Sequence, residues 1–331
     1  MSASLAITTG ATGLGDLGRV VILAGGLTHE RDVSLRSGRR VVDALRTQGI
    51  EAVLRDTDAR LLDALIADPP DAVFVALHGG DGEDGAVRGV LAMAGIPFVG
   101  SLPGPCRVAF DKPAAKAVLA AAGIATPPSY TLPATTFREL GAPSVLARLV
   151  VALGLPLMVK PARGGSALGA TVVRESDGLA EAMVSCFSYG EDALVERYVA
   201  GTELAVGVVD TGAGPEALPA VEIVVRNGGA YDYEARYTAG ETDFFAPARL
   251  SSEVAGRAAE VAVLAHRVLG LRDVSRADVV VDADGKVHLL EVNVSPGMTE
   301  TSLLPLAAAA AGLDLGRVCV DLLRQAVGRG G

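Results

Sequence analysis

Four polar side chains toward the end of the chain have types and spacing suited to binding a metal ion. Two β-branched runs flank the Asp-Gly step at residues 284–285, and this arrangement predicts a β-hairpin. A two-residue turn at that step places Asp278 opposite Glu291 and Arg276 opposite Asn293. Because side chains alternate between the two faces of a strand, all four should lie on the same face of the hairpin.

The two facing carboxylates need a positively charged partner. Their Cβ atoms would lie about 5 Å apart, and at an effective dielectric constant near 20 the charges would repel by roughly 3 kcal/mol. Two carboxylates and an amide oxygen suit a hard cation such as Mg²⁺, and Arg276 adds a planar fork for phosphate or an oxyanion. The alternative, a solvated hairpin face with one salt bridge, explains four polar groups on one face of apolar strands less well. We therefore predict a metal site formed by Asp278, Glu291 and Asn293.

A lysine followed by a loop of small residues is the second feature suited to chemistry. Residues 156–173 predict a strand that reaches Lys160, then a Gly-rich loop and another strand. Such a loop can place one charge and several backbone N–H groups around a triphosphate. Only four of the 29 basic residues are lysines, which favours a functional role for Lys112, Lys116 and Lys160. Lys286 lies in the predicted hairpin turn and is expected to be solvated.

Strands and helices alternate from residue 19 to residue 100, which predicts a parallel α/β sheet. Glu30 follows the Gly-Gly end of the first strand, where open α/β sheets bind ligands, although an acid at a helix start is an equally good reading. The third strand leads into residues 78–85, whose four glycines let the backbone approach a ligand closely. Residues 13–18 match GxGxxG, but they run into a strand instead of opening a helix, so no dinucleotide site is expected there.

A chain of 331 residues is too long for one ordinary core, so it should form several domains. We expect a flexible extension over residues 1–18 and an N-terminal parallel α/β domain over residues 19–107. A central, smaller α+β domain should cover residues 108–192, and a C-terminal mixed-sheet domain residues 193–331.

Composition excludes several classes of partner. A net charge of −10 argues against nucleic acid and anionic membranes, because binding to either depends on neutralising phosphates. The three cysteines are scattered without a CxxC pair, which is typical of reduced thiols in a cytoplasmic protein. No apolar run reaches membrane-spanning length, and the first residues lack the basic start of a secretion signal. We expect a cytoplasmic protein with small-molecule partners.

Eight segments together resemble the D-alanine–D-alanine ligase family of the ATP-grasp superfamily. They are, in order, GGLTHERDVSLRSG, HGGDGEDG, DKPAAK, VKPARGGSALG, VERYVAGTEL, YDYEARY, RAD and EVNVSPGMTETSL. The resemblance covers nearly the whole chain after residue 18 and implies an ATP-grasp fold. Any one segment is a weak signal, whereas eight in the family's order and at similar spacing are highly specific.

The resemblance implies a role for each matched residue around ATP. The phosphates would be held by Lys112, Lys160, Ser166 and Arg236. Adenine and ribose would be bound by Glu196, Tyr198, Val199 and Glu203. Two Mg²⁺ or Mn²⁺ ions would be held by Asp278, Glu291 and Asn293, in agreement with the hairpin argument.

The resemblance also implies where the amino-acid substrates bind. Glu30 would take the ammonium group of the first D-alanine and, with Ser166 and Tyr237, would tie a mobile loop over the site, with His78 nearby. An oxyanion would be bound by Arg276 and the Gly297 backbone. The carboxylate of the second D-alanine would be received by Ser302 and Leu303.

The implied reaction activates the first D-alanine as an acyl phosphate, which the amine of the second attacks to form D-alanyl-D-alanine for peptidoglycan precursors. Acyl phosphates hydrolyse readily, so closing loops must exclude water. The family also implies a homodimer. Two positions depart from the usual family pattern: Ala167 stands where a second serine is common, and Arg236 where lysine is common.

Two further readings stay open, and the two departures permit the first of them. A related ligase could make a product such as D-alanyl-D-serine, D-alanyl-D-lactate or another dipeptide. A nucleotide-binding sensor without catalysis is the third reading, and the intact metal set together with Arg276 argues against it.

Overall fold

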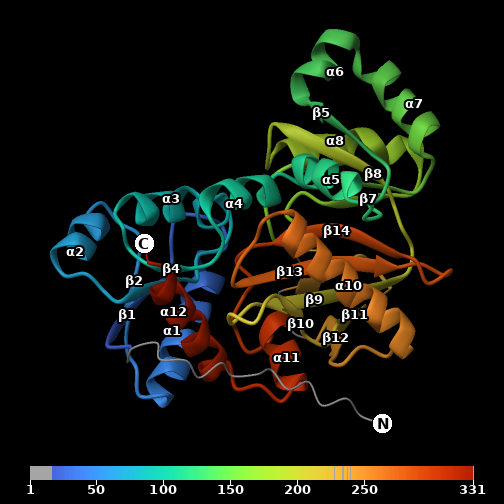
Figure 1. Ribbon diagram of the computed structural model, residues 1–331. Coiled ribbons are helices and arrows are strands. Elements are labelled where there is room, and N and C mark those ends of the chain that lie inside the picture. Colours follow the sequence, from blue (N-terminus) through green and yellow to red (C-terminus); the bar gives the residue numbers. More distant parts are fainter. Residues whose placement is uncertain (1–16, 227, 233–234, 237, 239, 331) are drawn as a thin grey trace.

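The computed structural model describes residues 17–330 except 227, 233–234, 237 and 239. Three sheets organise these residues, and each has its own region of the molecule (Figure 1). The predicted extension lies outside the described residues except for Leu17 and Gly18. Within the described part of the chain, no single helix is both long and apolar enough to span a membrane. The helices α11 (Leu303–Ala310) and α12 (Leu315–Arg329) meet those criteria only as a pair bent by 106°.

The first sheet is parallel, as predicted, with the strand order β2-β1-β3-β4. Its strands are β1 (Arg19–Leu23), β2 (Glu51–Arg55), β3 (Ala72–Val75) and β4 (Phe98–Val99). The helical segments that follow these strands are α1 (Arg31–Thr47), α2 (Leu61–Ala67), η1 (Gly80–Gly82), α3 (Ala86–Met93) and α4 (Pro103–Phe110). Val20 and Ile22 of β1 pack in one core with α1, whereas Val21 and Leu23 pack in another with α2 and α3. This alternation follows from the pleat of a strand that is buried on both faces.

The middle sheet is antiparallel, with the order β5-β8-β6-β7. Its strands are β5 (Ser129–Pro133), β6 (Leu157–Pro161), β7 (Thr171–Val173) and β8 (Asp192–Arg197). Its helical segments are α6 (Ala134–Leu140), α7 (Ala142–Leu153), η2 (Ser176–Gly178) and α8 (Leu179–Phe187). Because β8 pairs inside this sheet, we propose that the division expected at residue 193 follows Arg197 instead.

The third sheet has the order β12-β11-β9-β13-β14, with β10 paired to β9. Its strands are β9 (Thr202–Val209), β10 (Glu216–Ala217), β11 (Val221–Val225), β12 (Thr242–Phe245), β13 (Val274–Val281) and β14 (Val287–Asn293). The helices that pack against it include α5 (Lys112–Ala121), α10 (Ser252–Val268) and α11 (Leu303–Ala310), whereas α12 (Leu315–Arg329) packs against β3 and β4 of the first sheet. The ATP-grasp architecture expected from the sequence is present in this mixed α/β arrangement.

The β13–β14 hairpin has the predicted register at its polar end, although its turn was predicted wrongly. Asp278 pairs with Glu291, as expected. The Asp282 N–H donates to the Lys286 carbonyl at 3.0 Å, so three residues form the loop instead of two. Gly285 in that loop has a φ of 75°, which suits a three-residue hairpin loop. A bulge directly after Asp278 takes up the extra residue and restores the register.

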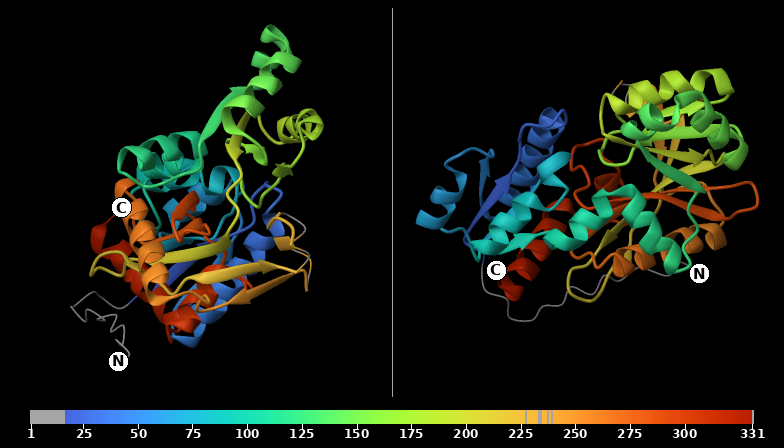
Figure 2. Two further views of the ribbon diagram at one scale, coloured as in Figure 1. Left: turned by 90° about the vertical axis from the view of Figure 1, so that its right-hand side faces the viewer. Right: turned by 90° about the horizontal axis from the view of Figure 1, so that it is seen from above.

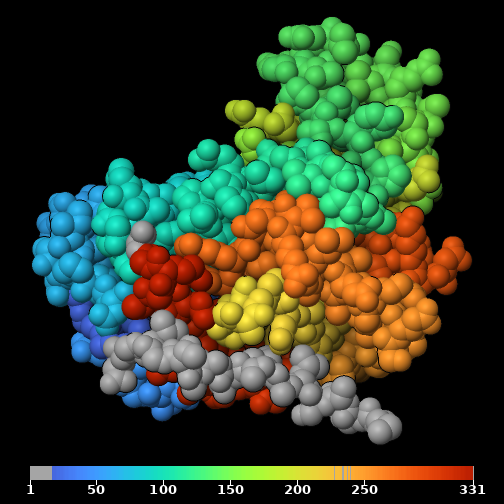
Figure 3. All heavy atoms as spheres, in the orientation of Figure 1, coloured from blue at the N-terminus to red at the C-terminus, as the bar shows by residue number. Residues whose placement is uncertain are grey.

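The first and third sheets share one hydrophobic core, whereas the middle sheet has its own. Side chains of β1, α1, β9, α11 and α12 belong to one buried cluster, and those of β6, α7, α8 and β8 to another. α12 at the end of the chain therefore returns to pack on α1 and the first sheet (Figure 1). The middle unit extends away from the rest of the molecule in Figure 2 and stands above it in Figure 3.

Candidate active site

The predicted site residues that the structure describes all line one or both of two adjoining cavities. We call the first the polar cavity, of about 120 Å³, which is lined by Glu30, His78, Ser166, Arg276, Asn293, Gly297, Ser302 and Leu303. We call the second the large cavity, of about 490 Å³, which is lined by Lys160, Glu196, Tyr198, Val199, Glu203 and Asp278. Both cavities are lined by Lys112, Arg236 and Glu291. Tyr237 lies outside the described residues.

Glu30 ends the β1–α1 connection and faces the loop that follows β6. The Ser166 hydroxyl donates to a Glu30 carboxylate oxygen across 136 residues of sequence. A side chain at either Gly79 or Gly165 would collide with that carboxylate or crowd it, so both glycines allow the close approach. The structure thus brings together Glu30 and Ser166, as predicted.

His78 is a buried link and not a free base. Its Nδ1 lies 3.0 Å from the Ser295 carbonyl and its Nε2 lies 2.9 Å from the Ser37 hydroxyl. A carbonyl only accepts, so Nδ1 carries the proton and Nε2 accepts from Ser37. Burial lowers the pKa of His78 to about 4, which keeps the imidazole neutral at physiological pH. The Ser37 hydroxyl also accepts from the Met298 N–H at 3.1 Å, so the link ends on the loop after β14.

The loop after β14 carries the predicted acceptor residues and is held by α1. Ser302 packs against Gly297, where any side chain would collide with its hydroxyl. The Ser302 hydroxyl accepts from the Thr299 N–H at 3.0 Å, which closes the loop on itself. Arg40 of α1 donates to the Thr299 carbonyl, and to the Met298 carbonyl at 3.3 Å. The sequence analysis missed Arg40, because nothing local distinguishes it from other helical arginines.

The facing carboxylates of β13 and β14 already have cationic partners from the chain. Arg276 donates from Nε and Nη2 to the two oxygens of Asp278 at 2.6 and 2.7 Å. The Lys112 ammonium lies 3.3 Å from a Glu291 oxygen and donates to the Gly164 carbonyl at 2.6 Å. Although burial opposes it, Lys112 and other nearby cations hold the pKa of Glu291 at about 2. Cationic side chains of the protein itself therefore partly neutralise both carboxylates.

The donor set fits a hard cation in its chemistry. Within the described residues there is no group of three or more His, Cys, Asp or Glu side chains arranged for a metal ion. The predicted set has only two such side chains, and its third member is Asn293, whose amide oxygen accepts from the Ser295 N–H at 2.7 Å. Each carboxylate oxygen has a second lone pair, and Glu291 lines both cavities. Two carboxylates and an amide suit Mg²⁺, which completes its shell with water and phosphate oxygens.

A buried ion triad lies beside the large cavity, and two of its members, Lys160 and Glu196, line that cavity. Glu196 of β8 binds the ammonium groups of Lys116 from α5 and of Lys160 from β6, the latter at 2.6 Å. Burial would raise the pKa of Glu196, but the two lysines lower it below its usual range. Removing one member of a buried ion network costs about 3–5 kcal/mol, because its partners stay charged and unpaired. Glu196 therefore has a structural role beside its predicted contact with adenine.

Arg236 lies where the two cavities meet, and its guanidinium stacks on an aromatic ring. Its guanidinium carbon is 4.5 Å from the centre of the Tyr231 ring, and its Nε donates to the Tyr231 carbonyl at 3.2 Å. The Tyr231 ring in turn meets Phe244 of β12 edge-on, with centroids 6.2 Å apart. Such a stack restricts the guanidinium to the junction.

Glu83 is a further cavity residue that the sequence analysis missed. It lies in the Gly-rich segment after β3, lines the polar cavity and is 6% exposed. Burial and the nearby Glu30 charge raise its pKa to about 7. The available sequence signal for Glu83 was its position among glycines that let the backbone approach a ligand closely. Its burial depends on tertiary packing, which no local pattern reveals.

Comparison with known proteins agrees with this geometry. Residues 118–324 match the family described as D-ala D-ala ligase C-terminus, and residues 62–101 match D-ala D-ala ligase N-terminus. The chain is 42% identical over 310 residues to a D-alanine–D-alanine ligase of Bordetella petrii, covering 94% of this chain and 92% of that protein. The chain belongs to the D-alanine–D-alanine ligase family.

Other members of the ligase family are similar along most of their length. An Anaeromyxobacter sp. (strain K) D-alanine–D-alanine ligase is 41% identical, with 92% of this chain and 96% of that one covered. A Bacillus anthracis D-alanine–D-alanine ligase complexed with ATP has a TM-score of 0.74 at 28% identity, with 94% and 97% covered. The VanG D-Ala:D-Ser ligase of Enterococcus faecalis has a TM-score of 0.79 at 26% identity, with 93% and 98% covered.

The loop after β6 contains one of the two departures from the usual ligase pattern. Ser166 and Ala167 have φ values of 52° and 55°, which is the left-handed region that non-glycine residues rarely adopt. Ala167 lines the large cavity, whereas Ser166 turns toward Glu30. The two consecutive left-handed residues thus send one side chain to each cavity.

Proposed function

We propose that this protein joins two molecules of D-alanine to D-alanyl-D-alanine with ATP, through an acyl phosphate. The observation that carries the proposal is the shared wall of the two cavities, formed by Lys112, Arg236 and Glu291. Phosphoryl transfer between a nucleotide and a small carboxylate needs one wall common to both sites. Ligase family membership supports the same reaction.

The roles follow the charges around each cavity. The D-alanine ammonium would pair with Glu30, and its carboxylate would attack the terminal phosphate of ATP beside Arg236. Arg276 and the Gly297 N–H would stabilise the oxyanion that forms when the second amine attacks. Ser302, at the start of α11, would hold the acceptor carboxylate, and the loop at Ser166 would exclude water from the acyl phosphate.

We propose that Asp278, Glu291 and Asn293 hold Mg²⁺ or Mn²⁺, expected as two ions. When bound, the metal would neutralise charge on the phosphates. Glu291→Gln should abolish turnover because the change removes one metal ligand. The protein should still fold, at a lower thermal unfolding temperature, because Lys112 loses the carboxylate that pairs with it. Asp282→Asn, at the far end of the same hairpin, is the matched control. Full activity of Glu291→Gln would remove Glu291 from the metal site.

The function is tested by product analysis with a panel of acceptors. The protein is incubated with ATP, Mg²⁺ and D-alanine alone, or with D-serine or D-lactate added, and phosphate release and product mass are measured. D-alanyl-D-alanine as the main product is expected. A dominant mixed product would favour the related ligase, and ATP binding without any product would favour the sensor. We further propose a cytoplasmic homodimer that supplies peptidoglycan precursors.

A further inference from the structure

Asp273 is a buried carboxylate in a backbone conformation that costs free energy. It directly precedes β13, is 1% exposed and has a φ of 66°. Non-glycine residues in the left-handed region are strained and persist where the surroundings impose that conformation. Contacts from other parts of the chain must therefore hold Asp273 in place.

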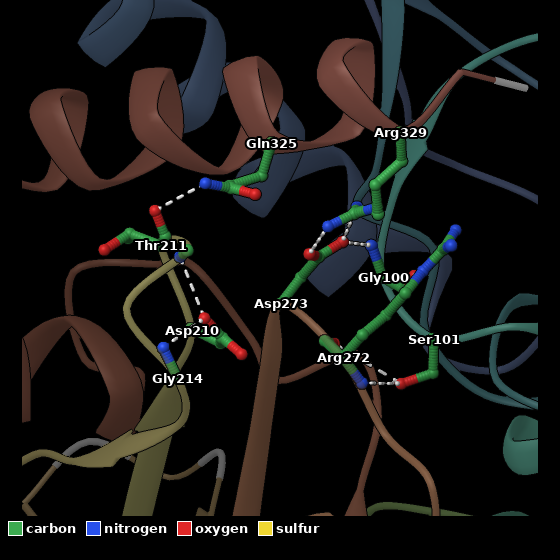
Figure 4. A network of polar contacts seen from close by, with 10 residues as sticks. Gly100, Ser101, Asp210, Thr211, Gly214, Arg272, Asp273, Gln325 and Arg329 are labelled. Atoms are coloured by element: carbon green, nitrogen blue, oxygen red, sulfur yellow. Dashed lines mark hydrogen bonds and ion pairs between the residues drawn. The ribbon is translucent and has the colours of Figure 1, made fainter. Parts of the chain in front are cut away.

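Those contacts come from three segments that are distant in sequence (Figure 4). Arg329, in the last turn of α12, donates from both Nη atoms to the Asp273 oxygens at 2.7 and 2.8 Å. The Gly100 N–H, just after β4, donates to the same carboxylate at 2.7 Å. The Asp273 carbonyl accepts from the Asp210 N–H at 2.7 Å, just after β9. Burial raises the pKa of Asp273, and Arg329 opposes that rise.

The neighbouring residue strengthens the same junction. Arg272 donates from Nε to the Gly100 carbonyl at 2.5 Å, and its N–H donates to the Ser101 hydroxyl at 3.1 Å. Its guanidinium also stacks on the Phe98 ring of β4 at 4.8 Å. The residues directly before β13 thus contact both β4 with the segment that follows it and the last turn of α12.

β13 carries the residues that the proposed reaction needs. Arg276 and Asp278 follow Asp273 by three and five residues, so in an extended strand the Arg276 Cα lies only about 10 Å from that of Asp273. We propose that Arg329 and Asp273 form a latch through which the C-terminal helix sets the position of β13, and with it the side chains of Arg276 and Asp278. Arg329 and Asp273 are positioning residues, since neither lines the polar cavity or the large cavity.

The experiment compares Arg329→Ala, Asp273→Gly and the double variant with the parent. Asp273→Gly removes the latch while it suits the left-handed backbone, so it should fold even if Arg329→Ala, whose buried carboxylate has lost its cationic partner, does not. Arg317→Ala is the matched control, because it removes an arginine on α12 that pairs with Asp321 of the same helix. Calorimetric titration with ADP and Mg²⁺ counts the binding-competent molecules, and dipeptide formation is expressed per competent molecule.

Each single variant should lower kcat about 10-fold and change the KM for ATP by less than about two-fold. The double variant should be no slower than the slower single variant, since both changes open one latch. Arg317→Ala should match the parent. If the single variants keep the parental kcat per competent molecule and only melt at a lower temperature, the contact merely stabilises the fold and the latch is overturned. Losses of kcat that add up in the double variant would overturn it as well.

The kinetic readout rests on the proposed function, so a second measurement is independent of it. Hydrogen exchange of the β13 amides should be faster in Arg329→Ala and in Asp273→Gly than in Arg317→Ala. If the parent makes no dipeptide, the proposed function fails and exchange alone decides the latch. Unchanged exchange in β13 would then overturn it.

Discussion

At the scale of single residues, Arg236 carries the sharpest prediction. Its guanidinium lies at the junction of the cavities, where it can stabilise the transferring phosphoryl group. Arg236→Ala should lower the single-turnover rate with ATP and D-alanine by at least about 100-fold, which corresponds to roughly 3 kcal/mol. Arg236→Lys should retain most of the rate, because a point charge still reaches one oxygen. Arg249→Ala is the control, since Arg249 also stacks on an aromatic ring, that of Phe245, but lines neither of the two cavities. A near-parental rate for Arg236→Ala would place Arg236 outside the reaction.

Glu83 gives a prediction about pH. Its pKa is about 7 in the folded protein against a usual value of 4.5, so the folded state holds a proton that the unfolded state has lost between these values. The stability that this proton provides is complete below pH 4.5 and is lost as the pH rises through 7. Glu83→Gln should therefore match the parent at pH 4.5 and be more stable at pH 8, by roughly 3 kcal/mol. Denaturant unfolding at both pH values measures this, with the exposed Glu139→Gln as the control. A constant difference between pH 4.5 and pH 8 would contradict the shifted pKa.

At the scale of elements, the loop between β6 and β7 determines how the nucleotide is held. The left-handed pair at Ser166 and Ala167 directs the Ala167 side chain into the large cavity. Ala167→Ser should lower the KM for ATP about five-fold, because one added hydrogen bond contributes about 1 kcal/mol. Ala170→Ser places the same hydroxyl outside the left-handed pair and should change the KM less. Equal KM values for all three proteins would show that the hydroxyl at residue 167 does not reach the nucleotide.

At the scale of the whole molecule, the two separate cores predict two patterns of local unfolding. Leu323 of α12 and Leu179 of α8 are both fully buried, one in the core shared by the first and third sheets and the other in the middle core. Either leucine changed to alanine should cost about 3 kcal/mol. Leu323→Ala should speed hydrogen exchange in β1 and β9 together, whereas Leu179→Ala should speed it only in the middle sheet. The two variants serve as controls for each other. Faster hydrogen exchange in β1 and β9 as well as in the middle sheet of Leu179→Ala would contradict the separation of these two cores.

Local pattern alone determined much of the architecture. The alternation of strands and helices predicted the parallel first sheet. The pairing of Asp278 with Glu291 was also predictable, because a period of two leaves few registers for a hairpin with one polar face. The residues that the motifs singled out, as far as the structure describes them, line one or both of the two cavities. These features depend on neighbours along the chain, so the sequence contains their signal.

Only the tertiary structure decided what surrounds those residues. The sequence did not reveal that Arg276 and Lys112 neutralise the facing carboxylates, that Glu196 binds two lysines, or that burial raises the pKa of Glu83. The latch joins Arg329 to Asp273 across 56 residues, and no periodicity or spacing predicts such a contact. Contacts of this kind depend on how α12 returns to the first sheet. That packing is set by the apolar surface that all the elements bury together, which no single segment encodes.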